Sequence, residues 1–270
     1  MAVVTAGARS FRWLARVGLA ARGIVYLLMG ILALLVALGQ RRGGLGDQRH
    51  AVQTLRTVPG GRVLLGLVAI GLAGYSLLRS AQGVFDTEHK GTDAKGVLRR
   101  IAYFVDGLFY TGIVAFAGHA AWSGHDGPTA QASRASQRGF AGRVLHWPGG
   151  AYLLDLAGLI VLGAGVFTLY KAASSRFMKD IDLSAVSDAR RGAIRRAGQL
   201  GYAARGIVMG IVGSFFLHAG HTARSSDMGS TKEALDVLAK MGPVVLGAVA
   251  SGLVAYGLYS FVEALYARQQ

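Results

Sequence analysis

Six long apolar segments dominate this sequence and restrict what the chain can fold into. Each is 17 to 23 residues long, and an α-helix needs about 20 residues to cross the roughly 30 Å hydrocarbon core of a bilayer. Buried helices of a water-soluble protein would carry polar faces, whereas stretches such as Val63–Ala73 carry none. The sequence therefore predicts an all-α membrane protein with six transmembrane helices. The segments are Gly18–Leu38, Gly61–Leu78, Ile101–Ala121, Gly150–Tyr170, Gly201–Leu217 and Pro243–Leu265.

The composition supports membrane insertion and removes several classes of chemistry. Only 16% of the residues are charged, whereas a soluble domain has about a quarter. The absence of cysteine excludes disulfides, thiolate nucleophiles and cysteine-ligated metals. The sequence also lacks a phosphate-binding loop, a nucleophile elbow and a His-Glu-x-x-His zinc motif. We therefore expect no enzyme activity and no cofactor.

The net charge of +15 is spread along the chain rather than gathered in a nucleic-acid-binding domain. Basic residues flank the apolar segments, where they meet anionic lipid head groups and set the orientation of the chain. The side that holds both termini carries 16 Lys and Arg, and the opposite loops carry 11. This predicts a multi-pass protein of the bacterial inner (plasma) membrane with both termini in the cytoplasm. The lipid bilayer and its anionic head groups are the expected partners, a membrane protein is a further candidate, and no nucleic acid is expected.

The chain repeats one hydrophobic unit three times. Gly18–Val25 reads GLAARGIV, Gly201–Val208 reads GYAARGIV, and Phe104–Phe109 reads FVDGLF at the same point of the middle copy. Each unit crosses the membrane twice, so all three face the same way, and such parallel repeats are related by an axis along the membrane normal. We predict a single membrane domain with pseudo-threefold symmetry. It spans residues 1–270, with repeats at about 12–80, 97–171 and 195–268.

The second helices, and the short stretches before them, also correspond between repeats. Gly71–Leu77 (GLAGYSL) matches Gly252–Leu258 (GLVAYGL), so each carries a tyrosine at the same place. Apolar residues recur every three or four positions in 51–56 and 234–238, which predicts short helices lying flat at the interface. Such helices would be caps over the outer mouth of the bundle, or elements for gating or partner binding.

Small residues predict close helix packing. Lipid tails are as apolar as leucine, so helix association in a membrane relies on close approach of the backbones. Gly66, Gly158, Gly163 and Gly165 are among the small residues on such faces. This predicts a tight bundle rather than a wide pore.

Arg22, Asp106 and Arg205 occupy the same position in the three repeats and form the first candidate site. Threefold symmetry would place them at one depth. An ionisable side chain in a membrane helix costs about 2.5–3.5 kcal/mol and usually faces a partner inside the bundle, so we expect Asp106 to pair with Arg22 or Arg205. Two alternatives stay open: the arginines extend to the head groups as anchors, or the layer lines a path for a substrate or ion.

Four further residues are candidates for the same intramembrane polar network. Tyr26, Tyr110 and Tyr202 stand three or four residues from the layer charges, on the same helix face. Their hydroxyls would complete the network, or their rings would serve as interfacial aromatics. Asp155 has no counterpart in the other repeats; it pairs with a basic residue or lies near the outer interface, five residues after Gly150.

Histidines give a weaker candidate, a metal site. His119 and His218 are equivalent in the repeats, and His221 lies three residues beyond His218. Two histidines at this spacing share a helix face and bind zinc or another divalent cation. The first repeat has Leu35 at the equivalent position, so a metal site would not be threefold, and ordinary interfacial histidines are the alternative.

Three tandem two-helix units, each opening near Ala-Arg-Gly-Ile-Val and followed by a Pro-Gly second helix with a late tyrosine, resemble an uncharacterised bacterial family. The family consists of integral membrane proteins and is known as a domain of unknown function in three repeats. The sequence motifs around Arg22 and Arg205 are the most specific part of this resemblance, and the repeat that contains Asp106 departs from them. The resemblance implies membrane location and repeat count, and carries over no catalytic residue. Mitochondrial carriers are similar in shape alone, because their Pro-x-[Asp/Glu]-x-x-[Lys/Arg] signature is absent.

Two functions of different class follow from these observations. The first is a compact structural or accessory bundle that binds lipid or a membrane partner, favoured by the small-residue packing and the lack of a catalytic constellation. The alternative is a small ion or anion transporter or channel that uses the layer of Arg22, Asp106 and Arg205. A metal-dependent membrane enzyme, the third reading, would require stoichiometric metal.

Overall fold

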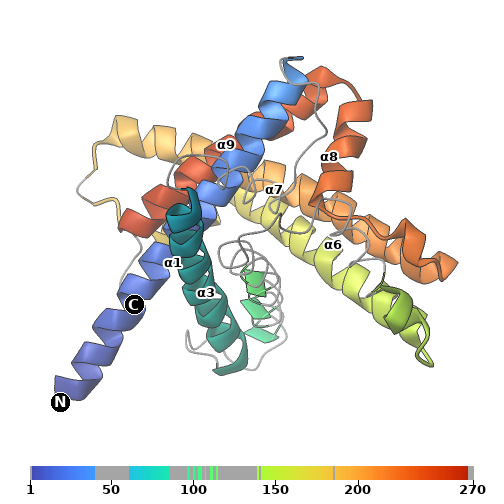
Figure 1. Cartoon of the computed structure of the whole chain (residues 1–270). Coiled ribbons are helices and arrows are strands. Elements are labelled where there is room, and N and C mark those ends of the chain that lie inside the picture. The colour runs from blue at the N-terminus through green and yellow to red at the C-terminus, as the bar shows by residue number, and fades with distance from the viewer. Residues whose placement is uncertain are drawn as a thin grey trace.

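The computed structural model describes residues 2–39, 61–85, 141–184 and 186–266, together with ten single positions between 96 and 139. Over these residues it is helical and has no β-strand. The helices are α1 (Ala2–Ala37), α3 (Gly61–Phe85), α6 (Gly150–Ser174), α7 (Asp188–Thr222), α8 (Thr231–Lys240) and α9 (Pro243–Tyr266), with two 3₁₀ turns, η1 (Arg176–Asp180) and η2 (Ser225–Asp227) (Figure 1).

Five of the six predicted segments coincide with long helices. Within the described residues, α1, α6, α7 and α9 are long and apolar enough to cross a membrane. They also present large apolar side chains on the surface: Val244 on α9 is 82% exposed and Tyr152 on α6 is 79% exposed. An extensive apolar surface marks contact with a membrane or another protein, so these helices suit a membrane protein. α3 is not among these four helices and only scattered positions of 101–121 are described, so the membrane crossing of both segments stays a prediction.

The long helices pack as two close pairs that meet at a crossing. α1 runs beside α9, and α6 runs beside α7 (Figure 1). α1 also packs on α3, and α7 also packs on α9. The core at these contacts therefore joins elements from both ends of the chain. Its largest buried aliphatic side chains are Met29, Leu72, Leu235, Leu246 and Leu253.

The three aligned glycines that follow the layer charges make the same contact. A Cβ built on each would lie about 3 Å from a backbone carbonyl oxygen of a neighbouring helix, so glycine permits a close approach there. The neighbour is in each case the second helix of the preceding repeat, with repeat 3 preceding repeat 1. The pairs are Gly23 with Gly257 of α9 (2.9 Å), Gly107 with Ser76 of α3 (3.0 Å) and Gly206 with Gly165 of α6 (3.0 Å).

A contact within the repeat also recurs. Gly18 lies against Tyr75, and Gly201 lies against Tyr256; a Cβ on either glycine would come within 2.6 Å of the tyrosine. The two glycines are aligned in the repeated octet, and the two tyrosines are aligned in the second-helix match. Repeats 1 and 3 therefore cross their own two helices at the same point.

α8 is a short amphipathic helix on the bundle, as predicted for 234–238. A capping box begins it: the Ser230 side chain accepts a hydrogen bond from the backbone N–H of Lys232, and the Glu233 carboxylate accepts one from the backbone N–H of Ser230. Its apolar face is inserted between the long helices, with Leu235 fully buried. α8 contacts both α7 and α9.

Two other predictions have different outcomes. The predicted flat helix at 51–56 lies outside the described residues. The prediction of close packing is confirmed at Gly158 and Gly165, which contact α7, whereas at Gly66 and Gly163 a Cβ would meet no atom of the described residues within 4 Å. Gly163 follows Gly158 by five residues, so it points about 140° away around the helix. The face of α6 that carries Gly158 and Gly165 packs on α7, whereas Gly163 lies on a different face of that helix.

Candidate functional site

Arg22 and Glu263 form a buried ion pair where the first and last helices meet. Arg22 lies on α1, Glu263 lies in the last turn of α9, and Arg22 Nη2 is 2.5 Å from Glu263 Oε2. Arg22 is 1% exposed and Glu263 is 7% exposed. Ser260, one turn before Glu263, accepts a hydrogen bond from the same Arg22 nitrogen at 3.3 Å. Because a buried charge left without its partner is strongly destabilising, this pair holds α1 against α9.

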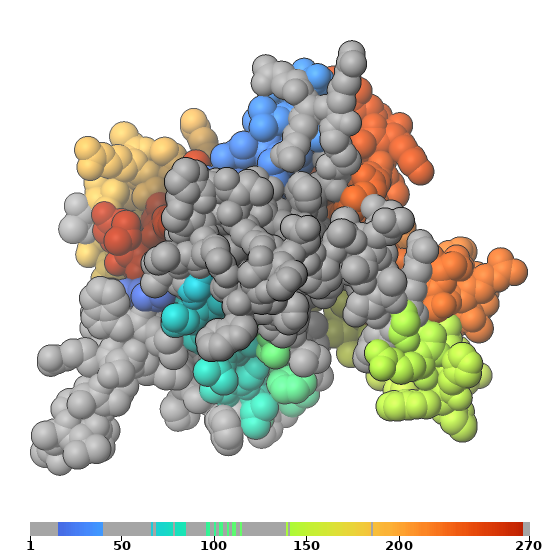
Figure 2. Space-filling view, viewed as in Figure 1, coloured from blue at the N-terminus to red at the C-terminus, as the bar shows by residue number. Residues whose placement is uncertain are grey.

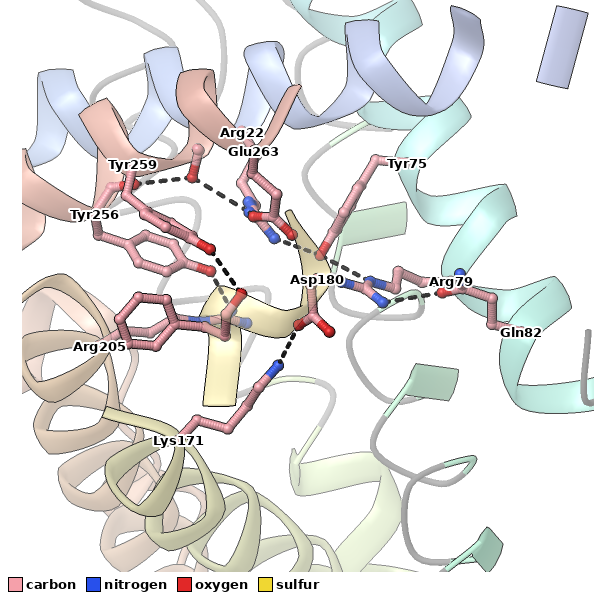
Figure 3. Close-up of polar contacts among 12 residues, drawn as sticks. Arg22, Tyr75, Arg79, Gln82, Lys171, Asp180, Arg205, Tyr256, Tyr259 and Glu263 are labelled. Atoms are coloured by element: carbon pink, nitrogen blue, oxygen red, sulfur yellow. Dashed lines mark hydrogen bonds and ion pairs between the residues drawn. The ribbon is translucent and has the colours of Figure 1, made fainter. Parts of the chain in front are cut away.

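The network continues from Arg22 onto α3 through one tyrosine hydroxyl. Arg22 Nη1 donates to the Tyr75 hydroxyl at 2.7 Å, and Arg79 Nε, one turn along α3, donates to the same oxygen at 2.9 Å. Arg79 Nη1 donates in turn to Gln82 Oε1 at 2.9 Å. Figure 3 shows this chain of contacts, which starts at Glu263. Three helices are thus joined by hydrogen bonds from charged donors, which are stronger than neutral ones.

Tyr256 of α9 links Arg22 to Arg205. Arg205 Nη1, on α7, donates to the Tyr256 hydroxyl at 2.5 Å. The guanidinium carbons of Arg22 and Arg205 lie 5.2 and 5.3 Å from the centre of the Tyr256 ring, within the range of a cation–π interaction. Each of these arginines therefore donates to the second-helix tyrosine of its own repeat, Arg22 to Tyr75 and Arg205 to Tyr256.

The predicted tyrosines contribute their rings to this cluster. Tyr26 and Tyr202 pack edge-on against Tyr256, with ring centres 4.8 and 5.2 Å away. Tyr110 packs edge-on against Tyr75 at 4.9 Å. Edge-on pairs place the positive ring edge against the negative face of a neighbour, so the rings support the two tyrosines whose hydroxyls accept from the arginines.

The two predicted aspartates have different positions. Asp106, the expected partner of the arginines, lies outside the described residues, and its pairing stays a prediction. Asp155 lies away from the network, with its carboxylate against Gly220, where the start of α6 meets the end of α7. Its predicted place near the outer interface stays a prediction. The acid that neutralises Arg22 is Glu263.

Sequence reasoning did not single out Glu263, Arg79 or the two second-helix tyrosines as members of the network. Glu263 is the sole charged residue of the apolar segment Pro243–Leu265, and an ionisable residue inside a membrane segment is a functional candidate by default. Tyr75 and Tyr256 are the polar residues that the second-helix match shares. These signals were present in the sequence, but they do not state which first-helix residue each would contact.

The segment 175–184, here called the strap, closes one end of the aromatic cluster. Phe177 is fully buried; its ring stacks on Tyr202 at 5.0 Å and meets Tyr259 edge-on at 5.1 Å. The Tyr259 hydroxyl donates to the Phe177 carbonyl at 3.1 Å. A Cβ on Gly198 would overlap the Phe177 ring, so a glycine on α7 makes room for the strap.

The strap also supplies a carboxylate to α6. Lys171 Nζ lies 3.2 Å from Asp180 Oδ2. Side-chain exposure falls from 52% at Asp180 and 25% at Lys171 to 10% at Glu263 and 1% at Arg22. Charged groups therefore extend from the surface into the interior of the bundle (Figure 3).

The candidate histidines do not gather into a metal site in the described part of the chain, where no group of three or more possible ligands occurs. His218 Nε2 lies 3.6 Å from Asp227 Oδ2, and the His218 side chain is 67% exposed. His221 is also exposed. His119 lies outside the described residues. The Thr222 hydroxyl donates to Asp227 at 2.7 Å and holds the pKa of that carboxyl below its ordinary value. These groups form a polar cluster at the C-terminal end of α7.

Comparison with known proteins places this arrangement in a family. A family model described as Domain of Unknown Function (DUF1206) matches the chain three times, at residues 17–86, 101–175 and 200–267. The uncharacterized protein YxxB of Bacillus subtilis (strain 168) is 31% identical over 253 residues, which cover 93% of this chain and 89% of the relative. No solved structure matches. A chain of apolar helices with three tandem family matches, and with a relative similar along almost its whole length, belongs to the DUF1206 family.

Proposed function

We propose that this protein is a closed bundle of six transmembrane helices, built as three parallel repeats about a pseudo-threefold axis, with a structural or accessory role in the membrane. The repeated glycine contacts support the symmetry, because each repeat packs its first helix on the second helix of the repeat before it. The bundle would bind lipid or a membrane protein partner and would carry out no catalysis.

The burial of Arg22 is the observation that carries this proposal. Its guanidinium is 1% exposed and is engaged by protein groups, namely the carboxylate of Glu263 and the hydroxyls of Tyr75 and Ser260. Removing one partner of such a pair costs about 3–5 kcal/mol, since it strands a buried charge. A network of this kind favours one helix arrangement over others and suits a scaffold better than a pathway that must open.

The orientation follows from the charge count and is part of the proposal. Basic residues in the segments 79–100 and 171–200 would face the cytoplasm, where both termini would also lie. The network, the strap and the end of α9 would then occupy the inner half of a bacterial inner membrane. α8 would lie on the outer surface. Labelling of single introduced cysteines tests this directly, because the native chain contains none.

Flux measurements in proteoliposomes test the closed-bundle role. We expect the wild-type protein to pass common anions and cations no faster than empty vesicles do. Glu263→Gln and Asp106→Asn, which alter the charge layer, should leave this background unchanged. Saturable flux in the wild type that either variant abolishes would contradict the accessory role.

A transporter or channel is the second candidate, and the gradient of exposure along the charged groups favours it. Asp180, Lys171, Glu263 and Arg22 pass from half-exposed to buried, as the residues of an entry path would. In that case the strap would be the inner gate. The same flux assay separates the two candidates, since only a transporter would gain or lose flux when Asp180 is replaced by Asn.

A further inference from the structure

An open groove lies at the end of α3, outside the buried network. Its volume is about 430 Å³, and it is lined by Gly83, Val84, Val97, Arg100 and Phe104. Figure 2 shows the surfaces of α3 and of described positions between 96 and 114 side by side. Gly83 brings α3 close to Arg100 and Phe104, since a Cβ on it would lie 2.8 Å from the backbone of Arg100 and from Phe104.

The walls of this groove are apolar and accessible. Val84 is 50% exposed, Val97 is 41% exposed and Phe104 is 44% exposed. Among the described residues that line it, Arg100 is the charged one. An apolar trough with a cation at its end matches an amphiphile that joins a hydrocarbon chain to an anionic head.

The guanidinium of Arg100 is held in place and still has donors to offer. Its Nε donates to the Gly83 carbonyl at 3.0 Å, and its Nη2 donates to the Val84 carbonyl at 2.8 Å, which are carbonyls that the end of a helix leaves without an intrahelical partner. Arginine has five N–H donors, so three find no acceptor in the described residues. A donor that is already oriented loses little entropy when an anion binds.

The equivalent place between repeats 2 and 3 is filled by the chain itself. Gln199 stands seven residues before Gly206, as Arg100 stands seven before Gly107. Gln199 Nε2 donates to Ser175 Oγ of the strap at 3.0 Å. The interface between repeats 2 and 3 therefore carries a built-in cover and a neutral side chain. The interface between repeats 1 and 2 instead carries a cation beside an open apolar groove.

We propose that the groove at Arg100 binds an anionic phospholipid, with the phosphate on Arg100 and an acyl chain along Val84 and Phe104. This site rests on the proposed membrane function and names the lipid that the bundle would hold. Lys95 and Arg99 beside it in the sequence add to a basic juxtamembrane segment of the kind that attracts anionic lipids.

Thermal melting of the full-length protein in detergent tests the site, with phosphatidylglycerol, phosphatidylcholine or inorganic phosphate added. We expect phosphatidylglycerol to raise the melting temperature, and we expect phosphatidylcholine and inorganic phosphate to leave it unchanged. Arg100→Gln should raise the lipid concentration for half-maximal shift about tenfold, as expected for a lost hydrogen bond to a charged group. Arg196→Gln, an equal loss of charge at an exposed position of α7, should leave it unchanged.

A second variant covers the possibility that Arg100→Gln weakens the end of α3. Val97→Trp keeps the arginine and fills the groove, so it should also abolish the lipid response. Equal responses of the Arg100 and Arg196 variants, or an unchanged response in Val97→Trp, would overturn the lipid site. So would equal shifts with phosphatidylcholine or with phosphate alone. Extraction of the chain from cells without detergent would instead overturn the membrane function on which the site rests.

Discussion

Arg22 and Glu263, 241 positions apart in the sequence, join the first and last long helices through a 2.5 Å contact in the interior of the protein. The pair closes the order of the repeats, because it lies at the interface where repeat 3 packs on repeat 1. No other described ion pair of this chain is as deeply buried. The stability of the whole arrangement should therefore depend on it.

Glu263→Gln tests that dependence. The variant leaves the Arg22 charge buried without its counter-ion, so we expect a loss of about 3–5 kcal/mol in unfolding free energy. Thermal or chemical denaturation in detergent measures it, and the double variant with Arg22→Gln should recover part of the loss. Asp188→Asn, which removes a carboxylate that is 99% exposed, should cost below about 1 kcal/mol. If Glu263→Gln lowers the unfolding free energy no more than this control does, the stability of the protein does not depend on the pair.

Tyr75→Phe tests the hydroxyl that two arginines share. Arg22 and Arg79 both donate to it, and a lost hydrogen bond at a buried charged donor costs about 1–3 kcal/mol. We expect Tyr75→Phe to lower the unfolding free energy by this amount in the same denaturation assay. Tyr152→Phe, at a side chain that is 79% exposed, should be nearly neutral, and equal effects of the two variants would show that the hydroxyl of Tyr75 is not needed.

The predicted pairing of Asp106 is tested by a double-mutant cycle with Arg205. Arg22 is already neutralised by Glu263, which leaves Arg205 as the layer arginine for Asp106 to pair with. Asp106→Ala should destabilise the protein, and adding Arg205→Ala should restore part of the stability, with a coupling of about 0.5–3 kcal/mol. Additive effects would exclude the pair.

Lys171 occupies the position that Glu263 holds in repeat 3. Gly165 and Gly257 make the same contact with the aligned first helices, and the two charged residues follow them by six positions. A glutamate at 171 would therefore be directed toward Arg205, as Glu263 is toward Arg22. In the native chain Lys171 is instead neutralised by Asp180 of the strap.

We expect Lys171→Glu to destabilise the protein through repulsion from Asp180, and Lys171→Glu with Asp180→Asn to recover that loss. Melting in detergent gives the coupling, which should exceed about 0.5 kcal/mol. Lys179→Glu combined with Asp180→Asn is the matched control, since Lys179 is an exposed strap residue. A coupling no larger than in this control would refute the ion pair between Lys171 and Asp180.

Asp227 gives a pH-dependent prediction just after the C-terminal end of α7. Its pKa lies below the ordinary value of 3.8, chiefly because the Thr222 hydroxyl donates to it. A carboxyl with a lowered folded-state pKa adds stability above its unfolded pKa and loses it as the pH falls through the folded pKa. Wild-type and Asp227→Asn melting curves should therefore differ at neutral pH and converge in acid; a constant difference down to pH 2 would contradict this.

The sequence alone was enough to predict five long helices and the threefold repeat of the chain. Apolar segments of membrane-crossing length become α1, α3, α6, α7 and α9 because their backbone groups must be satisfied within the helix, whatever lies around them. The octet shared by Gly18–Val25 and Gly201–Val208 likewise indicated repeats, and the aligned glycines make equivalent contacts. These are local properties, so the length of each apolar segment and the spacing of the repeated residues are enough to predict them.

The partners of the charged residues were decided by the tertiary structure. Glu263, Tyr75 and Tyr256 reach the arginines because helices from different repeats pack side by side, and the sequence spacing of Arg22 contains no information on which neighbour faces it. The burial of Phe177 depends likewise on a gap at Gly198 on another helix. Helix formation is a property of each segment, but neutralising a buried charge needs a group brought in from a distant part of the chain.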